Sequence, residues 1–114
     1  MVGVIFKNRK IRVPAREVSF FSMGLIFRTR NTKNLWFKRI PEGNFSLTSF
    51  FVFFPFLVLW LDKKKKVVDL RIAGPFQARI NTKKRFSSVI EIPINKQNKK
   101  IIKFFVGKER FKYN

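Results

Sequence analysis

The chain has 114 residues, which suits one domain spanning residues 1–114, and its 46% apolar content is typical of a globular protein. Twenty-six basic residues against six acidic ones give a formal net charge of +20, which either favours polyanions as partners or only keeps the protein soluble. The absence of cysteine and histidine excludes disulfides, thiol nucleophiles and Ser-His-Asp triads, and it leaves none of the usual zinc ligands.

The first predicted element is a β-hairpin. Two short segments, Val4–Lys7 and Lys10–Val13, flank Asn8-Arg9, which is interpreted as a two-residue turn in which Asn tolerates positive φ. Pro14 is expected to end the second strand. The basic residues here also interrupt any apolar signal-peptide segment, so a cytoplasmic protein is expected.

A helix and a short strand are predicted next. Val18, Phe21 and Leu25 form one helical stripe within Ala15–Phe27, because residues at i, i+3 and i+7 share a face. Leu35–Phe37 is then a short aromatic strand.

The apolar run Phe50–Leu61 is predicted to be strand rather than a membrane span. Its twelve residues would give a helix of about 18 Å against about 30 Å of hydrocarbon, and Pro55 would break that helix. Two strand segments, Leu47–Phe54 and Phe56–Leu61, are therefore expected to meet at a bend at Pro55, with both faces covered. Membrane association through residues 50–61 is the alternative.

A hairpin turn follows at Asp62–Lys66. The next residues predict a half-buried strand of period two, in which Val68, Leu70 and Ile72 alternate with Val67, Asp69 and Arg71.

Two more strands are predicted in the C-terminal third, separated by a polar turn at Asn95–Lys100 and ending at Gly107. The first places Phe86, Ser88, Ile90, Ile92 and Ile94 on one face, and the second places Ile102, Phe104 and Val106 toward the core. The expected fold is mainly β (all-β or α+β): a single compact curled sheet or small barrel of mostly antiparallel hairpins with one short helix.

Three stretches of the chain form an ordered pattern: GLIFR (24–28), FFVFFPFLVLWLDKKKKVVDL (50–70) and PFQARINTKKRFSSVIEIP (75–93). This pattern resembles the family catalogued as domain of unknown function 192, also called uncharacterised protein family 0127. The resemblance covers residues 4 to 94 and implies a compact, largely β protein with one short helix and no established activity.

The chain departs from the family pattern at three positions. Thr48 stands where the family often has His, Leu57 where it often has Asp, and Lys65 where the turn usually has Gly. Any chemistry carried by a His–Asp pair in the family would therefore be lost here. A Lys in place of Gly implies a different turn or a small positive-φ cost.

The candidate polyanion-binding residues form two basic clusters joined by an intervening arginine. Flexible lysines suit nonspecific phosphate contacts because a phosphate backbone demands no fixed fork geometry. Trp36, Phe37 and Phe76 could stack on bases if exposed, although core packing is the more ordinary role for aromatic residues. The candidate cations are Lys63, Lys64, Lys65, Lys66, Arg79, Lys83, Lys84 and Arg85.

Other functional classes find less support. Asp62 and Asp69 are interpreted as surface ion pairs or a turn cap rather than a catalytic carboxylate pair. The chain is therefore expected not to be an enzyme and to need no cofactor or metal. A non-enzymatic binding module with an unknown ligand is the main expectation, with nucleic acid as a candidate partner, and the apolar excess leaves room for a homodimer interface. High Lys and Arg content without Cys also fits a thermophilic source, although ion-pair networks would need more acids.

Overall fold

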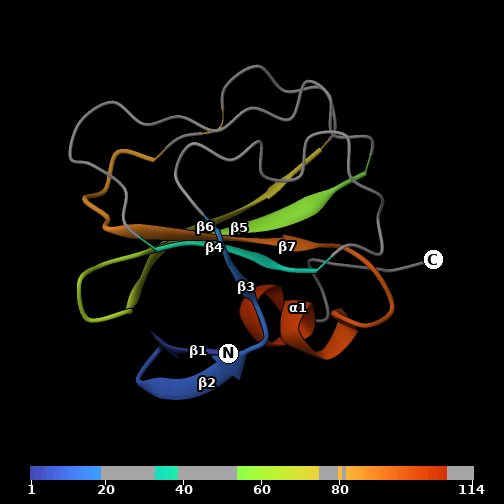
Figure 1. Cartoon of the computed structure of the whole chain (residues 1–114), viewed down its shortest axis with the longest axis horizontal. Coiled ribbons are helices and arrows are strands. Elements are labelled where there is room, and N and C mark those ends of the chain that lie inside the picture. Colours follow the sequence, from blue (N-terminus) through green and yellow to red (C-terminus); the bar gives the residue numbers. More distant parts are fainter. Residues whose placement is uncertain (19–32, 39–53, 75–79, 81, 108–114) are drawn as a thin grey trace.

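The computed structural model describes residues 1–18, 33–38, 54–74, 80 and 82–107. Within these ranges the fold is mainly β, with two sheets and one short helix, which confirms the predicted fold class (Figure 1). The elements are β1 (Val2–Phe6), β2 (Arg9–Val13), β3 (Arg16–Val18), β4 (Leu35–Phe37), β5 (Phe56–Leu61), β6 (Val67–Ala73), β7 (Ser88–Pro93) and α1 (Lys99–Val106).

Strands β5 and β7 lie at the centre of a five-stranded sheet of order β3-β4-β7-β5-β6. All neighbouring pairs are antiparallel except β3 and β4, which are parallel. Every residue of β5 is buried, as its continuous apolar run predicts, so the expected strand Phe56–Leu61 is confirmed. Phe54 lies at a bend before Pro55, and the remainder of the predicted segment Leu47–Phe54 falls outside the described residues. The edge strands β3 and β6 do not pair with each other among the described residues, so the sheet is not closed into a barrel.

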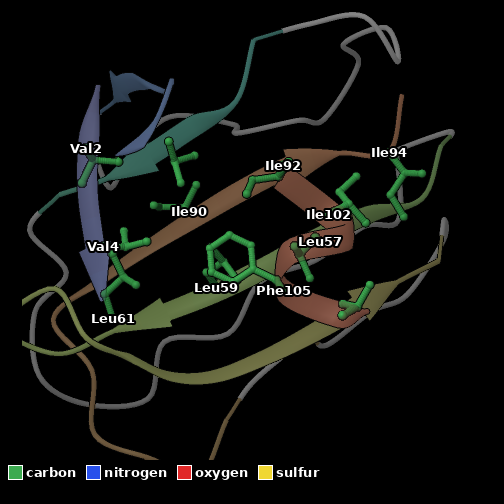
Figure 2. Packing of buried hydrophobic residues seen from close by; sticks show 12 residues of the cluster. Val2, Val4, Leu57, Leu59, Leu61, Ile90, Ile92, Ile94, Ile102 and Phe105 are labelled. Atoms are coloured by element: carbon green, nitrogen blue, oxygen red, sulfur yellow. The ribbon is translucent and has the colours of Figure 1, made fainter. Parts of the chain in front are cut away.

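One face of this sheet is covered by α1 and by the β1–β2 hairpin (Figure 1). Alternate residues of β5 and β7 supply the sheet side of the contact, because successive side chains in a strand point to opposite faces. Figure 2 shows these side chains filling the space between the sheet and its cover. The labelled members are Val2, Val4, Leu57, Leu59, Leu61, Ile90, Ile92, Ile94, Ile102 and Phe105.

The opposite face of the sheet carries a second apolar cluster built from the intervening residues of the same strands. Its strand residues are Leu35, Phe37, Phe56, Val58, Trp60, Ala73 and Val89, with Phe54 and Ile80 beside them. The short strand Leu35–Phe37 is thus confirmed, and it divides its aromatics between the two faces, since Phe37 joins this cluster and Trp36 joins the other. The predicted strand face of β7 needs a correction at Phe86, which packs against this cluster while Ile90 and Ile92 face the other.

The N-terminal hairpin is confirmed with its turn shifted by one residue. Phe6 pairs with Arg9, so the two turn residues are Lys7 and Asn8 rather than Asn8 and Arg9. Both have positive φ, 50° and 64°, as a two-residue type I′ turn requires. The second strand ends at Val13 before Pro14, as predicted.

A β-bulge changes the side-chain pattern of β6. The register with β5 shifts between Trp60 and Leu61, so the ladder skips Val68. Val68 then packs on the face of Trp60, while Val67 and Leu70 pack on the face of α1. The predicted strand is confirmed, but the predicted shared face of Val68 and Leu70 is wrong because the extra residue reverses the alternation.

The predicted helix over Ala15–Phe27 is wrong at its start. Arg16–Val18 forms β3, which pairs in parallel with β4, and the Arg16 backbone N–H donates to the Asn34 carbonyl at 2.7 Å. Pairing with a distant strand satisfies these backbone groups in place of helical hydrogen bonds. Residues 19–27 of that prediction lie outside the described ranges.

The predicted C-terminal strand is also wrong, because Lys99–Val106 is helical. The helix buries Ile102, Phe105 and Val106, which follow the i, i+3, i+4 spacing of one helix face. Gly107 ends it at φ 77°, and its N–H donates to the Lys103 carbonyl at 2.9 Å. The helix that the structure describes thus lies where a strand was predicted.

A buried pair of amides ties the start of α1 to the sheet. The Asn34 Nδ2 group donates to Asn98 Oδ1 at 3.0 Å, and the Asn98 Nδ2 group donates to Asn34 Oδ1 at 2.8 Å. The same two groups also donate to the carbonyls of Pro14 and Pro93, each at 2.8 Å. Both side chains therefore have several of their hydrogen-bonding groups satisfied although both residues are buried.

Candidate polyanion-binding site

The turn between β5 and β6 presents Lys63, Lys64, Lys65 and Lys66 as exposed residues around one carboxylate. Asp62 Oδ1 accepts hydrogen bonds from the backbone N–H groups of Lys64 at 2.8 Å and Lys66 at 2.9 Å. Asp62 therefore caps the turn, as the sequence interpretation proposed. Lys65 has φ 63°, so the predicted hairpin turn is confirmed with a lysine in a conformation that favours glycine.

A second basic segment precedes β7. The residues Lys83, Lys84 and Arg85 are exposed. Hydrogen bonds to Thr82 fix the start of the loop that carries them. The Thr82 hydroxyl donates to Asp69 Oδ2 at 2.6 Å, and the Lys84 N–H donates to Thr82 Oγ1 at 3.1 Å. The acid on β6 thereby fixes the start of the loop.

The two basic segments lie at the same end of the sheet. Leu61, the last residue of β5, pairs with Ser88, the first residue of β7, and the Ser87 N–H donates to the Leu61 carbonyl at 2.7 Å. Seven of the eight candidate cations thus belong to two adjacent connections, and Arg79 lies outside the described residues.

The β1–β2 hairpin lies beside the lysine turn and adds to this basic end of the sheet. The Ile5 N–H donates to the Lys65 carbonyl at 2.9 Å, and Ile5 forms a parallel bridge with Lys66. A cavity of about 280 Å³ opens between the hairpin and the turn. Its lining consists of Met1, Gly3, Ile5, Lys10, Arg12, Lys64 and Lys65.

Trp36 is the partly exposed aromatic residue beside these cations. The Lys65 Nζ atom lies 5.4 Å and the Lys38 Nζ atom 5.6 Å from the centroid of a Trp36 ring, within cation–π range. Phe37 is 3% exposed and belongs to the core, so it is not a stacking platform. Phe76 lies outside the described residues.

The acids near the site have structural partners. Asp62 caps the turn, and Asp69 accepts from the Leu70 N–H at 2.9 Å as well as from Thr82. Glu17 forms an exposed ion pair with Lys38 at 2.9 Å. No group of three potential metal-ligating side chains occurs in the described part of the chain.

Searches with the chain found no matching family model, no matching curated protein and no matching solved structure. The resemblance to domain of unknown function 192 therefore stays a prediction. Two of its departures can be placed: Leu57 is buried against α1, and Lys65 has the positive φ expected where the family has Gly. Thr48 lies outside the described residues. Across the described ranges, no helix has the length and apolar character needed to cross a membrane.

Sequence reasoning missed Lys10 and Arg12 as candidate site residues. Both alternate along β2 with Ile11 and Val13, which face the core. That alternation predicts two outward-facing cations. Their proximity to the lysine turn depends on the Ile5–Lys65 contact, for which no local sequence pattern exists.

Proposed function

We propose that this protein is a non-enzymatic binding module whose ligand is a polyanion, with nucleic acid as the candidate class. One observation carries the proposal: Leu61 and Ser88 pair where β5 runs into the lysine turn and where the Lys83–Arg85 loop runs into β7, so both basic segments lie at the same end of the sheet. Their cations are exposed, and the nearby acids are too few to neutralise them. Such a surface attracts a phosphate backbone and releases its counterions on contact.

The proposed recognition is tolerant of sequence. Lysine ammonium groups act as mobile point charges and contact phosphates, and phosphate contacts carry no base information. We also propose a cytoplasmic location, where nucleic acid is present. Self-association remains a separate proposal, to be measured by sedimentation.

Lipid is the less favoured partner. The alternative of membrane association relied on residues 50–61, yet residues 56–61 form β5 and all six are buried. Their side chains are packed against the two apolar clusters and are not available to contact acyl chains.

The first prediction tests the basic end of the sheet through its salt dependence. Duplex DNA binding is titrated at several salt concentrations with wild type and with a variant in which Lys63–Lys66 are all replaced by Gln. Counterion release gives a slope of about −0.9 per phosphate neutralised, so the variant should lose a few units of slope and weaken on every sequence.

A second quadruple variant is the matched control. Replacing Lys96, Lys99, Lys100 and Lys103 with Gln removes the same charge from the turn after β7 and from α1, which begins at the opposite end of that strand. This control should retain most of the wild-type slope. Equal losses in both variants would show that only net charge matters, and absence of wild-type binding at low salt would overturn the proposed function.

A further inference from the structure

We propose that the cavity between the β1–β2 hairpin and the lysine turn is a site for a polyvalent phosphate group, such as a di- or triphosphate. This inference rests on the proposed polyanion binding but is more specific. Exposed lysines on a surface can follow a backbone of singly charged diesters, whereas four basic residues around one cavity can match several charges in one place.

The register of the hairpin builds the cavity. Gly3 pairs with Arg12 and Ile5 pairs with Lys10, so these four residues share one face of the two-stranded sheet. The other face carries Val2, Val4 and Val13 into the core. The Ile5–Lys65 hydrogen bond and the Ile5–Lys66 bridge place the lysine turn along the edge of β1 that does not pair with β2, and from there Lys64 and Lys65 complete the lining.

The lining is positively charged and leaves space beside Gly3. Four of the seven lining residues are Lys or Arg, and none of the seven is acidic. The Arg12 guanidinium can make a bidentate contact with phosphate oxygens, while the three lysines add point charges. Gly3 leaves room at the centre: a Cβ atom there would meet only the Lys10 Cε atom, at 3.4 Å.

The contact between Lys65 and Trp36 allows ligand binding to be followed by Trp36 fluorescence. Lys65 is one of the residues that line the cavity, and its Nζ atom lies 5.4 Å from the centroid of a Trp36 ring. Its backbone has the positive φ that a lysine adopts only at a cost. A phosphate group in the cavity attracts this ammonium and changes its distance from the indole. Bound ligand should therefore change Trp36 fluorescence, and a Trp36→Phe variant should lose that change.

The test compares labelled single-stranded oligonucleotides that carry either a 5′-hydroxyl or a 5′-triphosphate, with inorganic tripolyphosphate as competitor. Binding is followed by anisotropy and by Trp36 fluorescence. Because the triphosphate can accept charged hydrogen bonds that the 5′-hydroxyl cannot, we expect the triphosphate strand to bind at least about tenfold more tightly. Arg12→Gln and Lys10→Gln should remove this preference.

Gly3→Val is a variant that blocks the cavity without altering charge. Its side chain points into the cavity from a strand where a β-branched residue is well tolerated. It should abolish the triphosphate preference while leaving 5′-hydroxyl binding and its salt slope unchanged. Circular dichroism and thermal melting check that each variant is folded.

The binding results distinguish the two proposals as follows. Preference for the triphosphate strand with weak competition by tripolyphosphate supports a nucleic-acid terminus as the source. Equal potency of tripolyphosphate supports the same site with a free phosphate compound as ligand. Equal binding of both strands, lost in the Lys63–Lys66 variant, keeps the proposed function and overturns this inference. No binding of either strand or of tripolyphosphate overturns both.

Discussion

Strand β5 and the turn that follows it are adjacent in the chain and opposite in environment. All six residues of β5 are buried, while the four lysines of the turn are exposed. Burial of apolar area drives folding, whereas concentrated like charge opposes it. The protein thus separates the part that holds the fold together from the part proposed to bind, and substitutions in the two parts should have different effects.

The largest effect is expected at the centre of the sheet. Leu59→Ala should lower the free energy of unfolding by about 2–5 kcal/mol, because it removes a fully buried side chain and leaves a cavity. Chemical denaturation monitored by circular dichroism measures the loss. Ile72→Ala, at a residue 37% exposed in the neighbouring strand, is the control and should cost much less. A Leu59→Ala loss below about 0.5 kcal/mol would contradict burial on this face.

An intermediate effect is expected where the cover is tied to the sheet. Asn98→Ala removes two reciprocal hydrogen bonds and leaves Asn34 with unpaired buried groups, so it should cost about 1–3 kcal/mol. The double variant Asn34→Ala/Asn98→Ala separates the pair from its other contacts. Its loss should be smaller than the sum of the two single losses, and additive losses would show that the two amides act independently.

The smallest effect is expected in the turn itself. Asp62→Ala removes the acceptor for two backbone N–H groups and should cost about 1 kcal/mol in an exposed turn. Asp62→Asn keeps an oxygen acceptor and should cost less. If thermal melts of the two variants are equally lowered, the carboxylate charge rather than the turn cap is what stabilises this end.

Much of the sheet could be predicted from local pattern. Three elements follow from local sequence: the continuous apolar run of Phe56–Leu61, the alternation around Ile90 and the turn at Asp62–Lys66. Burial of a strand and the geometry of a turn depend on residues that are neighbours in the chain. The bulge at Val68 and the strand Arg16–Val18 were missed. Both depend on pairing with another strand, and no neighbouring residue reports it.

The C-terminal helix was missed because Asn98, at its N-cap position, is the one start signal that its sequence carries. No acid occurs in its first turn, which carries Lys99 and Lys100 instead, and the Asn98 side chain does not cap it. In so apolar a segment a period-two and a helical pattern both fit, and they differ only in whether Phe104 or Phe105 faces inward. The cavity with Lys10 and Arg12 was unpredictable for a related reason, since it forms only when the hairpin docks on a distant turn.

The position of β7 between β4 and β5 has a consequence for folding kinetics. The β1–β2 and β5–β6 hairpins join near neighbours and can form within about 1–10 μs. Strand β7 closes a long loop to each of its two neighbours, since both Leu35 and Val58 pair with Glu91. The entropy of these closures is lost before burial compensates for it, so the arrival of β7 is expected to limit the rate. Until then both edges of a growing apolar sheet lie open, and the positive charge at its end would keep such intermediates apart.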